Sequence, residues 1–303
     1  MQRKWEGVKK LIESGESIVS ACKVFGVSRS GYYKNKKVRT DQPALKRELP
    51  IIDERIASII QEIIKERPTY GYRRTWAVLR FDREILVNKK KVQRIMRLKG
   101  WQAKMMKRPS RRSGEWYWKK QNVVDPKSRV ESMLPDIRWS TDLTKFYVAE
   151  EGWVNFIPVI DCCTRECVGK SISVRGRARE ARDALEEAVL NRFGSIQEVP
   201  EGLSMRMDNG SIFLSKEYWR ELKRLGIEAE FTPYRCPSAN GIVERFFKTF
   251  KEECAWQNTF KSLEEAEGII EEWITFYNTK RRHSRLDYKT PIEYRESLRK
   301  LAA

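Results

Sequence analysis

The sequence has 303 residues, of which 40% are hydrophobic, and this is enough for one large domain or two to three small ones. A chain of this composition is folded, which excludes a disordered tail. The formal net charge of +19 favours association with a polyanion, either nucleic acid or an acidic membrane surface. No apolar run of about 18 residues occurs, and the first residues lead into a polar segment, so we expect a soluble, cytoplasmic protein with no membrane partner.

The positive charge is concentrated in the first part of the chain. Residues 1–130 contain 34 lysines and arginines against 13 acidic residues, whereas the rest has 27 basic and 29 acidic residues. A basic part followed by a nearly neutral part indicates that one part grips nucleic acid while the other has a different task.

The residues that commonly form metal knuckles or disulfide frameworks are sparse. His283 is the only histidine, so a zinc site of cysteines and histidines lacks partners. The cysteines show no framework spacing, so we expect them to be reduced, and we expect Cys162, Cys163 and Cys167 to pack within strands. The cysteines of the chain are Cys22, Cys162, Cys163, Cys167, Cys236 and Cys254.

Residues 1–40 have the outline of a helix-turn-helix. An amphipathic stretch near Val8–Ile12 precedes a second helix over Ser17–Phe25, and Gly26 supplies the turn. Ser28 can cap the third helix, which places Arg29 in its first turn, where such a motif contacts DNA. A small helical bundle that does not read DNA remains the alternative.

A second helical domain is predicted over residues 45–105. Apolar residues at helical spacing predict a helix over Leu49–Glu66, and two shorter helices follow at Tyr72–Leu79 and Lys89–Leu98. The last helix carries a row of cations that is either an ordinary solvated face or a face pressed against phosphates. The basic linker at 106–134 favours the second interpretation, because it has few compensating acids and is typical of an arm along DNA.

From residue 135 to 260 the pattern changes to strands followed by alternating helices and strands. Three strands, at Asp136–Val148, Trp153–Asp161 and Glu166–Val174, predict an antiparallel meander. Further elements are predicted at Ala178–Phe193, Leu203–Met207, Lys216–Leu225, Ile227–Phe231 and Asn240–Cys254. This order predicts an α/β fold, an RNase H-like core with a mixed five-stranded sheet and helices, preceded by the small all-α domains. Residues 261–303 form a helical extension that begins with Leu263–Tyr277.

Three carboxylates are candidates for catalysis. Asp142 is predicted at the centre of the first strand, where an unpaired buried carboxylate is costly. Asp208 follows the strand Leu203–Met207, and Glu244 lies beside the packing stripe of a helix. Three acids suit Mg²⁺ or Mn²⁺, and two ions about 3.5–4 Å apart can activate a nucleophile and stabilise a leaving oxygen. Spacing alone is weak support, because Asp208-Asn209-Gly210 is also a turn sequence and Glu244 can pair with Lys248.

The residues around these acids decide between the two interpretations. They resemble the OrfB integrase-core product of the IS-three family of bacterial insertion-sequence transposases, and 35 residues separate Asp208 from Glu244, as is typical of that integrase superfamily. Lys251 lies two helical turns after Glu244, where the family has a basic residue near DNA. The resemblance covers nearly the whole chain and is carried by Gly26–Tyr33, Pro68–Arg74, Asn88–Met96, Trp139–Thr144, Asp208–Ser211, Pro237–Lys251 and Tyr277–Leu286.

The resemblance implies a DDE-type transposase with Asp142, Asp208 and Glu244 as catalytic residues and ligands of two ions. It implies cleavage of insertion-sequence ends, strand transfer and a circular intermediate. The alternatives are a nuclease without joining activity and a catalytically silent regulator or scaffold. In the tail, contact with phosphate and anchoring of the last helix are equally open, and we expect a structural role for His283. The residues expected to contact DNA are Arg29, Arg73, Arg74, Lys89, Lys90, Lys91, Arg94, Lys107, Arg108, Arg111, Arg112, Lys248, Lys251, Arg281 and Arg282.

The resemblance also implies the partners. These are double-stranded DNA, as the terminal inverted repeats and as the target, and further copies of the chain in a dimer or larger assembly on that DNA. The family adds an upstream OrfA product, joined by a frameshift fusion, and a nucleoid-associated place in the bacterial cytoplasm. This chain has no sustained heptad repeat of its own.

Overall fold

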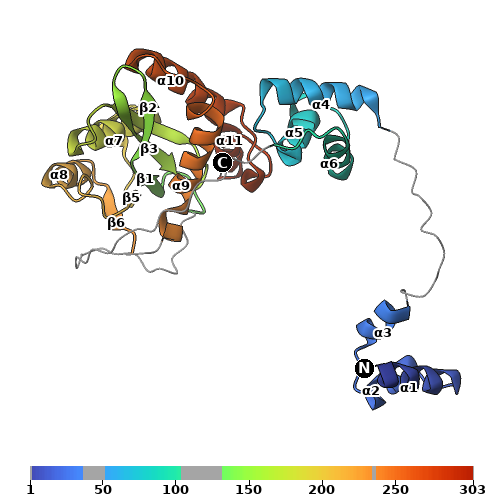
Figure 1. Ribbon diagram of the computed structural model, residues 1–303. Coiled ribbons are helices and arrows are strands. Elements are labelled where there is room, and N and C mark those ends of the chain that lie inside the picture. The colour runs from blue at the N-terminus through green and yellow to red at the C-terminus, as the bar shows by residue number, and fades with distance from the viewer. Residues whose placement is uncertain (1, 37–51, 104–131, 234–236, 303) are drawn as a thin grey trace. The chain divides into compact units, whose positions relative to one another are not determined.

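The computed structural model describes residues 2–36, 52–103, 132–233 and 237–302 (Figure 1). The chain divides into two compact units, Met1–Ile52 and Asp53–Ala303. Most of the predicted basic linker lies outside the described residues, including Lys107, Arg108, Arg111 and Arg112. In the described ranges no helix is long and apolar enough to cross a membrane.

The first unit contains three short helices, α1 (Gln2–Glu13), α2 (Ile18–Val24) and α3 (Arg29–Lys36). Ser28 caps α3 as predicted, because its hydroxyl accepts a hydrogen bond from the Gly31 amide at 3.2 Å. Gly26 makes the preceding turn with φ +62°, a backbone conformation that glycine adopts without strain. The helices pack around a small core of Val8, Ala21, Cys22 and Tyr32.

The second unit begins with a helical part. It contains α4 (Glu54–Glu66), α5 (Tyr72–Ala77), the π-helical turn η2 (Val78–Asp82) and α6 (Lys89–Leu98). Asp53 caps α4 and Asn88 caps α6, each through its side-chain oxygen. The predicted bounds of α6 are confirmed, and the predicted helix after Tyr72 continues as a π-helical turn.

The remainder of the second unit is built on one mixed sheet in the order β2-β3-β1-β5-β6, with β4 paired to β3. β5 is parallel to both β1 and β6, and the other pairs are antiparallel. The strands are β1 (Arg138–Thr141), β2 (Thr144–Val148), β3 (Gly152–Asp161), β4 (Cys167–Ser173), β5 (Ser204–Met207) and β6 (Glu228–Phe231).

The sheet has six strands rather than five because the predicted first strand is interrupted at Asp142 and Leu143. β1 and β2 pair with the same edge of β3 in one continuous register, with Thr141 opposite Val159 and Thr144 opposite Phe156. This register puts Asp142 opposite Pro158, which has no amide hydrogen to donate. Asp142 therefore lies at a break between two collinear strands and not, as predicted, inside one.

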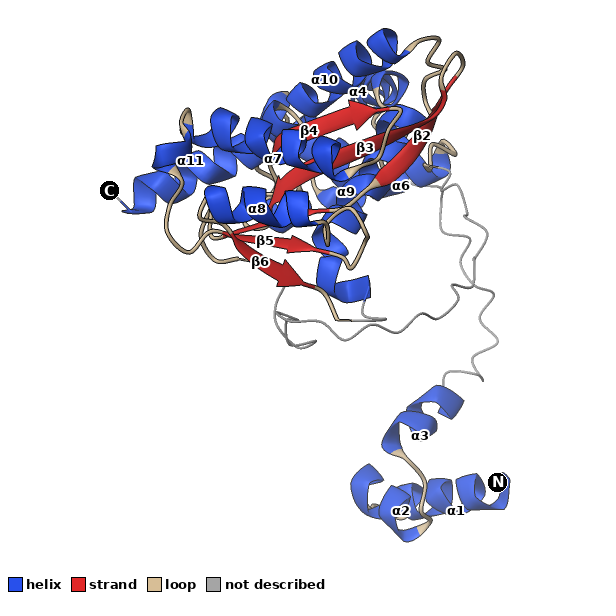
Figure 2. Ribbon diagram, turned by 90° about the vertical axis from the view of Figure 1, so that its left-hand side faces the viewer, coloured by secondary structure: helices blue, strands red, loops and turns tan. Residues whose placement is uncertain are grey.

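Helices cover both faces of this sheet (Figures 1 and 2). One hydrophobic core joins α7 (Ala178–Phe193) and α8 (Lys216–Arg224) to residues of β1, β3 and β5. The other joins α9 (Gly241–Phe250) and α10 (Leu263–Thr279) to β2 and β3. A π-helical turn, η5 (Lys251–Ala255), continues α9, and α11 (Pro291–Ala302) follows α10. The short 3-10 turns are η3 (Ile196–Glu198), η4 (Pro237–Asn240) and η6 (Ser284–Leu286). The result is the expected α/β core of a mixed sheet with helices.

A buried ion-pair triad attaches the helical part to the core. Glu253 lies on η5 and forms two ion pairs. One is with Arg74 of α5 at 2.5 Å, and the other is with Arg281, which follows α10, at 2.8 Å. Burial raises the pKa of Glu253, but the two arginines outweigh it, so the pKa lies below its ordinary value. Removing Glu253 would leave the buried guanidinium of Arg281 without a counter-charge, which is strongly destabilising.

We expect Gly169→Ala to destabilise the fold, because α7 packs directly on β4 at this glycine. A Cβ at Gly169 would lie 2.5 Å from the backbone nitrogen of Ala188 and 2.6 Å from the carbonyl oxygen of Ala184. Overpacking of this kind lowers the free energy of unfolding by about 1–3 kcal/mol or more, measurable by chemical denaturation.

The control is Gly268→Ala, in the exposed middle of α10, where a Cβ would meet no atom within 4 Å. Since alanine favours a helix over glycine by about 1 kcal/mol, this variant should be slightly more stable than the parent. Equal stability of the two variants would contradict the close packing at Gly169.

Candidate active site

The register between β1 and β5 brings two of the three candidate acids together. Arg138 pairs with Ser204 and Ser140 with Arg206, in parallel. Continuing by two residues sets Asp142 beside Asp208, and neighbouring strands lie about 4.8 Å apart. The two side chains project to the same face of the sheet as Ser140 and Arg206, because side chains alternate along a strand.

Backbone amides fix the orientation of both carboxylates. The Leu143 amide donates to Oδ1 of Asp142 at 2.7 Å, and the Gly210 amide donates to Oδ1 of Asp208 at 2.8 Å. In addition, Asn209 donates from its side chain to the Thr232 carbonyl at 2.8 Å, which ties the Asp208 turn to the end of β6. The turn interpretation of Asp208-Asn209-Gly210 is therefore correct, and this turn is also what orients the acid.

Asn240 holds the helix that carries Glu244 against β1. Its side-chain oxygen accepts a hydrogen bond from the Ser140 hydroxyl, and its amide donates to the Thr141 carbonyl at 3.3 Å. Both Ser140 and Asn240 are buried. Glu244 is one helical turn after Asn240, so the same contact brings Glu244 over the end of β1 next to Asp142.

A buried polar network supports this arrangement from below. Arg206 is fully buried, pairs with Glu230 at 2.8 Å and donates to the Ala239 carbonyl at 3.4 Å, while Arg138 also pairs with Glu230 at 2.9 Å. Burial raises the pKa of Glu230, but hydrogen bonds from Arg138 and Ser204 and the charge of Arg206 lower it below its ordinary value. The two arginines thus keep Glu230 ionised.

Sequence reasoning missed these supporting residues, although a signal for them exists. Polar residues alternate along all three strands, as Arg138 and Ser140, Ser204 and Arg206, and Glu228 and Glu230. Period-two alternation predicts that they share one face of the sheet. Asn240 carried no such signal, because an asparagine before a helix is typical of an ordinary N-cap.

The environment of Asp142 strongly disfavours its ionised form. Burial raises its pKa to about 7, with further contributions from the charges of Asp208 and Glu244; the Leu143 amide and the Lys251 ammonium oppose the rise. The pKa of Glu244 is also raised, by burial. These mutual effects show that the three acids and Lys251 share one neighbourhood, where a cation would relieve the repulsion between carboxylates.

The residues fit a divalent metal that is shared with substrate. In the described part of the chain, no three His, Cys, Asp or Glu side chains are grouped so as to hold a metal ion by themselves. However, Mg²⁺ is typically bound by one or two carboxylates together with water and substrate phosphates. Asp142 and Asp208, side by side and oriented by amides, supply such a pair of hard oxygen ligands.

The predicted DNA-contacting residues divide into two groups, and the first is accessible. Lys91 pairs with Asp53 at 2.7 Å, and the Lys89 ammonium lies 4.1 Å from the centre of the Trp76 ring, so both are partly engaged. Lys251 is half-buried beside the acids. The remaining members of this group are exposed: Arg29, Arg73, Lys90, Arg94 and Lys248.

The second group consists of Arg74, Arg281 and Arg282, and the structure uses them internally. Arg281 is 3% exposed and pairs with Glu253, as does Arg74. Arg282 pairs with Asp82 at 2.6 Å and with Glu293. Their guanidinium groups already pair with carboxylates of the protein, which leaves fewer donors for the predicted contact with DNA. The anchoring interpretation of the tail is the one that the structure supports.

His283 belongs to this anchored tail. Its ring packs edge-on against Tyr277 at 4.9 Å and lies next to the Arg281 guanidinium. Burial and the positive charge of Arg281 lower the pKa of His283 well below its ordinary value. The imidazole is therefore neutral at pH 7, consistent with the expected structural role.

Comparison with known families agrees with this architecture. Residues 134–237 and 225–291 match two models, each described as an integrase core domain, and residues 52–109 match a model described as an HTH-like domain. The chain thus belongs to the class of proteins with an integrase core.

Comparison with individual proteins gives the family. The chain is 30% identical over 293 residues to "Transposase InsD for insertion element IS2D" of Escherichia coli strain K12, covering 92% of this chain and 90% of that protein. It is 29% identical to "Insertion element IS2A uncharacterized 48.2 kDa protein" of Escherichia coli, covering 96% of this chain and 68% of the relative. The chain belongs to the IS-three family of insertion-sequence transposases and is a DDE-type enzyme of DNA transposition.

Solved structures share lower similarity. The simian T-cell lymphotropic virus intasome in complex with a PP2A regulatory subunit matches with a TM-score of 0.43 and 18% identity, over 55% of this chain and 56% of that chain. The HTLV-2 integrase catalytic core domain in complex with magnesium matches with a TM-score of 0.40 and 19% identity, over 54% of this chain and 98% of that chain.

We expect Gly210→Ala to impair catalysis without unfolding the protein. A Cβ at Gly210 would lie 2.8 Å from Oδ1 of Asp208, so this carboxylate would have to turn away from its place beside Asp142. Because misplacing a reacting group by about 1 Å can cost 100-fold, DNA cleavage should fall about 10- to 100-fold. The melting temperature should change little, since only the end of a side chain has to move.

The matched control for Gly210→Ala is Gly241→Ala, at the start of α9, where a Cβ would meet no atom within 4 Å. This variant should cleave within about twofold of the parent. Full activity of Gly210→Ala would show that the orientation of Asp208 does not limit the reaction.

Proposed function

We propose that this transposase cleaves the ends of its insertion sequence and joins the freed 3′-hydroxyl to another phosphodiester, with Asp142, Asp208 and Glu244 as its catalytic residues. The observation that carries the proposal is the parallel register that sets Asp142 beside Asp208, below a helix that presents Glu244. The three acids would hold two Mg²⁺ or Mn²⁺ ions, which when bound activate the attacking hydroxyl and stabilise the leaving oxygen.

The division of labour along the chain follows from its charge. We propose that the helices of 1–40 and 45–105, with the basic linker 106–134, hold double-stranded DNA. Residues 135–260 would perform the chemistry, and the extension 261–303 would anchor the helical part to this core. The exposed cations Arg73, Lys90 and Arg94 favour phosphate contact by the second domain. Near the acids, Lys248 is exposed and Lys251 is half-buried, so they can meet the phosphates next to the cut.

The proposed reaction also has requirements beyond a single chain. Joining one end of the insertion sequence beside the other makes a circular intermediate, which is later integrated into target DNA. Two ends have to be held at once, so we propose a dimer or larger assembly on DNA in the bacterial nucleoid. An upstream OrfA product, supplied by frameshift fusion, would add to end recognition.

The products of a DNA assay test the proposed activity. With Mg²⁺ and labelled ends of its insertion sequence, the protein should release nicked ends and then joined strands. Asp142→Asn should abolish both products, because an amide cannot act as an anionic metal ligand, and it should leave end binding within a few-fold.

Asp183→Asn, which changes a partly exposed aspartate on α7, is the control and should retain both products. Hydrolysed ends without joining would instead indicate a nuclease, and the absence of both products would indicate a DNA-binding scaffold. Joined strands from Asp142→Asn would remove Asp142 from the site.

The pKa of Asp142 predicts how stability depends on pH. In metal-free buffer the folded protein keeps this proton up to about pH 7, whereas the unfolded chain loses it near pH 4. The folded state therefore binds more protons in this window, so the free energy of unfolding falls as the pH rises from 4 to 7. Asp142→Asn lacks this loss and should be more stable than the parent at pH 8 by up to about 4 kcal/mol.

Thermal melts at pH 4 and pH 8, with and without Mg²⁺, measure this effect. At pH 8 added Mg²⁺ should raise the melting temperature of the parent, because the ion binds only the folded state, and it should have much less effect on Asp142→Asn. The same pH dependence in both proteins would contradict the buried, repelled state of Asp142.

A further inference from the structure

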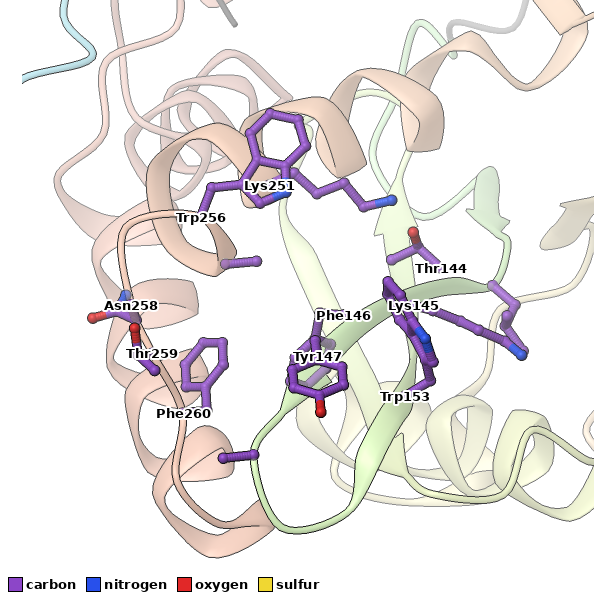
Figure 3. A pocket seen from close by; sticks show the side chains of 13 residues that line it. Thr144, Lys145, Phe146, Tyr147, Trp153, Lys251, Trp256, Asn258, Thr259 and Phe260 are labelled. Carbon is purple, nitrogen blue, oxygen red and sulfur yellow. The ribbon is translucent and has the colours of Figure 1, made fainter. Parts of the chain in front are cut away.

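A groove of about 820 Å³ runs along the outer edge of β2, beside the candidate active site (Figure 3). One wall is formed by β2 and the start of β3, and the other by η5 and the segment that leads to Phe260. Phe260 closes the far end, where it bridges to Val148 of β2. The volume lies within the range of about 300–1,000 Å³ that is typical of small-ligand sites.

Three large aromatic side chains line this groove and remain open to solvent. The exposed fractions are 60% for Tyr147, 63% for Trp153 and 45% for Trp256. Leaving such large apolar surfaces exposed is unfavourable, and clustered exposed aromatic rings mark interaction sites. We call the space between them the aromatic groove.

Packing within the β2–β3 hairpin does not explain why all three aromatic side chains are exposed. Tyr147 and Trp153 are cross-strand neighbours whose rings meet edge-on at 5.8 Å, an arrangement that supports a hairpin. Both nevertheless stay more than half exposed. Trp256 belongs to the other wall, where Figure 3 shows it near Lys251 and across the groove from the strand side. Aromatic surface is therefore presented from both walls.

The charge of the aromatic groove suits a nucleic-acid strand. Lys145 and Lys251 are among the lining residues, and none of the described residues that line the groove is acidic. Asn258 and Thr259 add neutral polar groups. A groove that combines cations with stacking platforms is the usual means of holding a single strand, since every base has a flat face and every linkage a phosphate.

The aromatic groove is continuous with the three acids. Leu143 lines it and directly follows Asp142, to which its amide donates. Lys251 lines it as well and follows Glu244 by two helical turns. A strand whose phosphate lies at the acids can thus continue into the groove without leaving the protein surface.

We propose that the aromatic groove binds one or two unpaired nucleotides of the DNA next to the scissile phosphate. The bases must be unpaired, because a duplex offers only base edges in its grooves and covers the faces by stacking. This proposal rests on the proposed function for its substrate class, but binding can be measured without catalysis. The groove would hold the end of the DNA open while the acids act on it.

Binding of two fluorescein-labelled probes in metal-free buffer tests the groove. One is a blunt duplex of 20 base pairs, and the other is the same duplex with an extension of three unpaired thymidines. Stacking of a base on an aromatic ring corresponds to about a fivefold to 150-fold gain in affinity. The parent should therefore bind the extended probe at least fivefold more tightly in fluorescence anisotropy.

Trp153→Leu and Trp256→Leu should each remove most of this preference while binding the blunt duplex as the parent does. Trp219→Leu, at a partly exposed tryptophan on α8 outside the groove, is the matched control and should keep the preference. Melting temperatures of all variants check their folding. With 5-iododeoxyuridine in the extension, ultraviolet light should crosslink the probe to Tyr147, Trp153 or Trp256.

Equal affinity of the parent for both probes would overturn the proposal and would favour a peptide strand along the edge of β2 instead. A preference that survives both groove substitutions would also overturn it. Failure of the proposed function is distinguishable, since a protein that joins no DNA can still prefer the extended probe. Conversely, a protein that joins DNA but binds both probes equally would refute the groove alone.

Discussion

The parallel pairing of β1 with β5 is the constraint on which the site depends. It forces two carboxylates, Asp142 and Asp208, to the same level of adjacent strands, where their repulsion and burial work against folding. The fold tolerates this because the polar network of Arg138, Arg206 and Glu230 holds the same three strands together, and Asn240 holds α9 above them. The two carboxylates are thus held close together despite their repulsion, as expected of a site that binds a cation.

Much of the fold was predictable because its elements obey simple periodicities. The bounds of α6 and α7 follow from apolar spacing and caps, and the meander follows from alternation. The break in the first strand at Asp142 was not predictable, because it arises opposite Pro158 on the neighbouring strand. The role of Arg281 was hidden for the same reason: an arginine that pairs with Glu253 looks in sequence like one that meets phosphate. Long-range pairing, rather than local pattern, decides both cases.

The candidate site shows the same division. The sequences around Asp142, Asp208 and Glu244 carried the family resemblance, and the register explains how the first two meet. The aromatic groove had no comparable signal, because Tyr147, Trp153 and Trp256 are separated by turns and by a hundred residues. Aromatic residues in strands are usually core residues, so only their exposure distinguishes these three.

The ion pairs of Glu253 hold the helical part of the second unit at one distance from the three acids. Because Arg74 ties the helical part directly to the helix that carries Glu244, the cations on α6 keep a constant separation from the acids. If those cations hold DNA as proposed above, one particular phosphate would lie at the acids. Inserting a single base pair between the two contacts would move that phosphate by about 3.4 Å and turn it by about 35° around the duplex. The position of the cut would then be set by counting along the helix rather than by reading the bases at the cut itself.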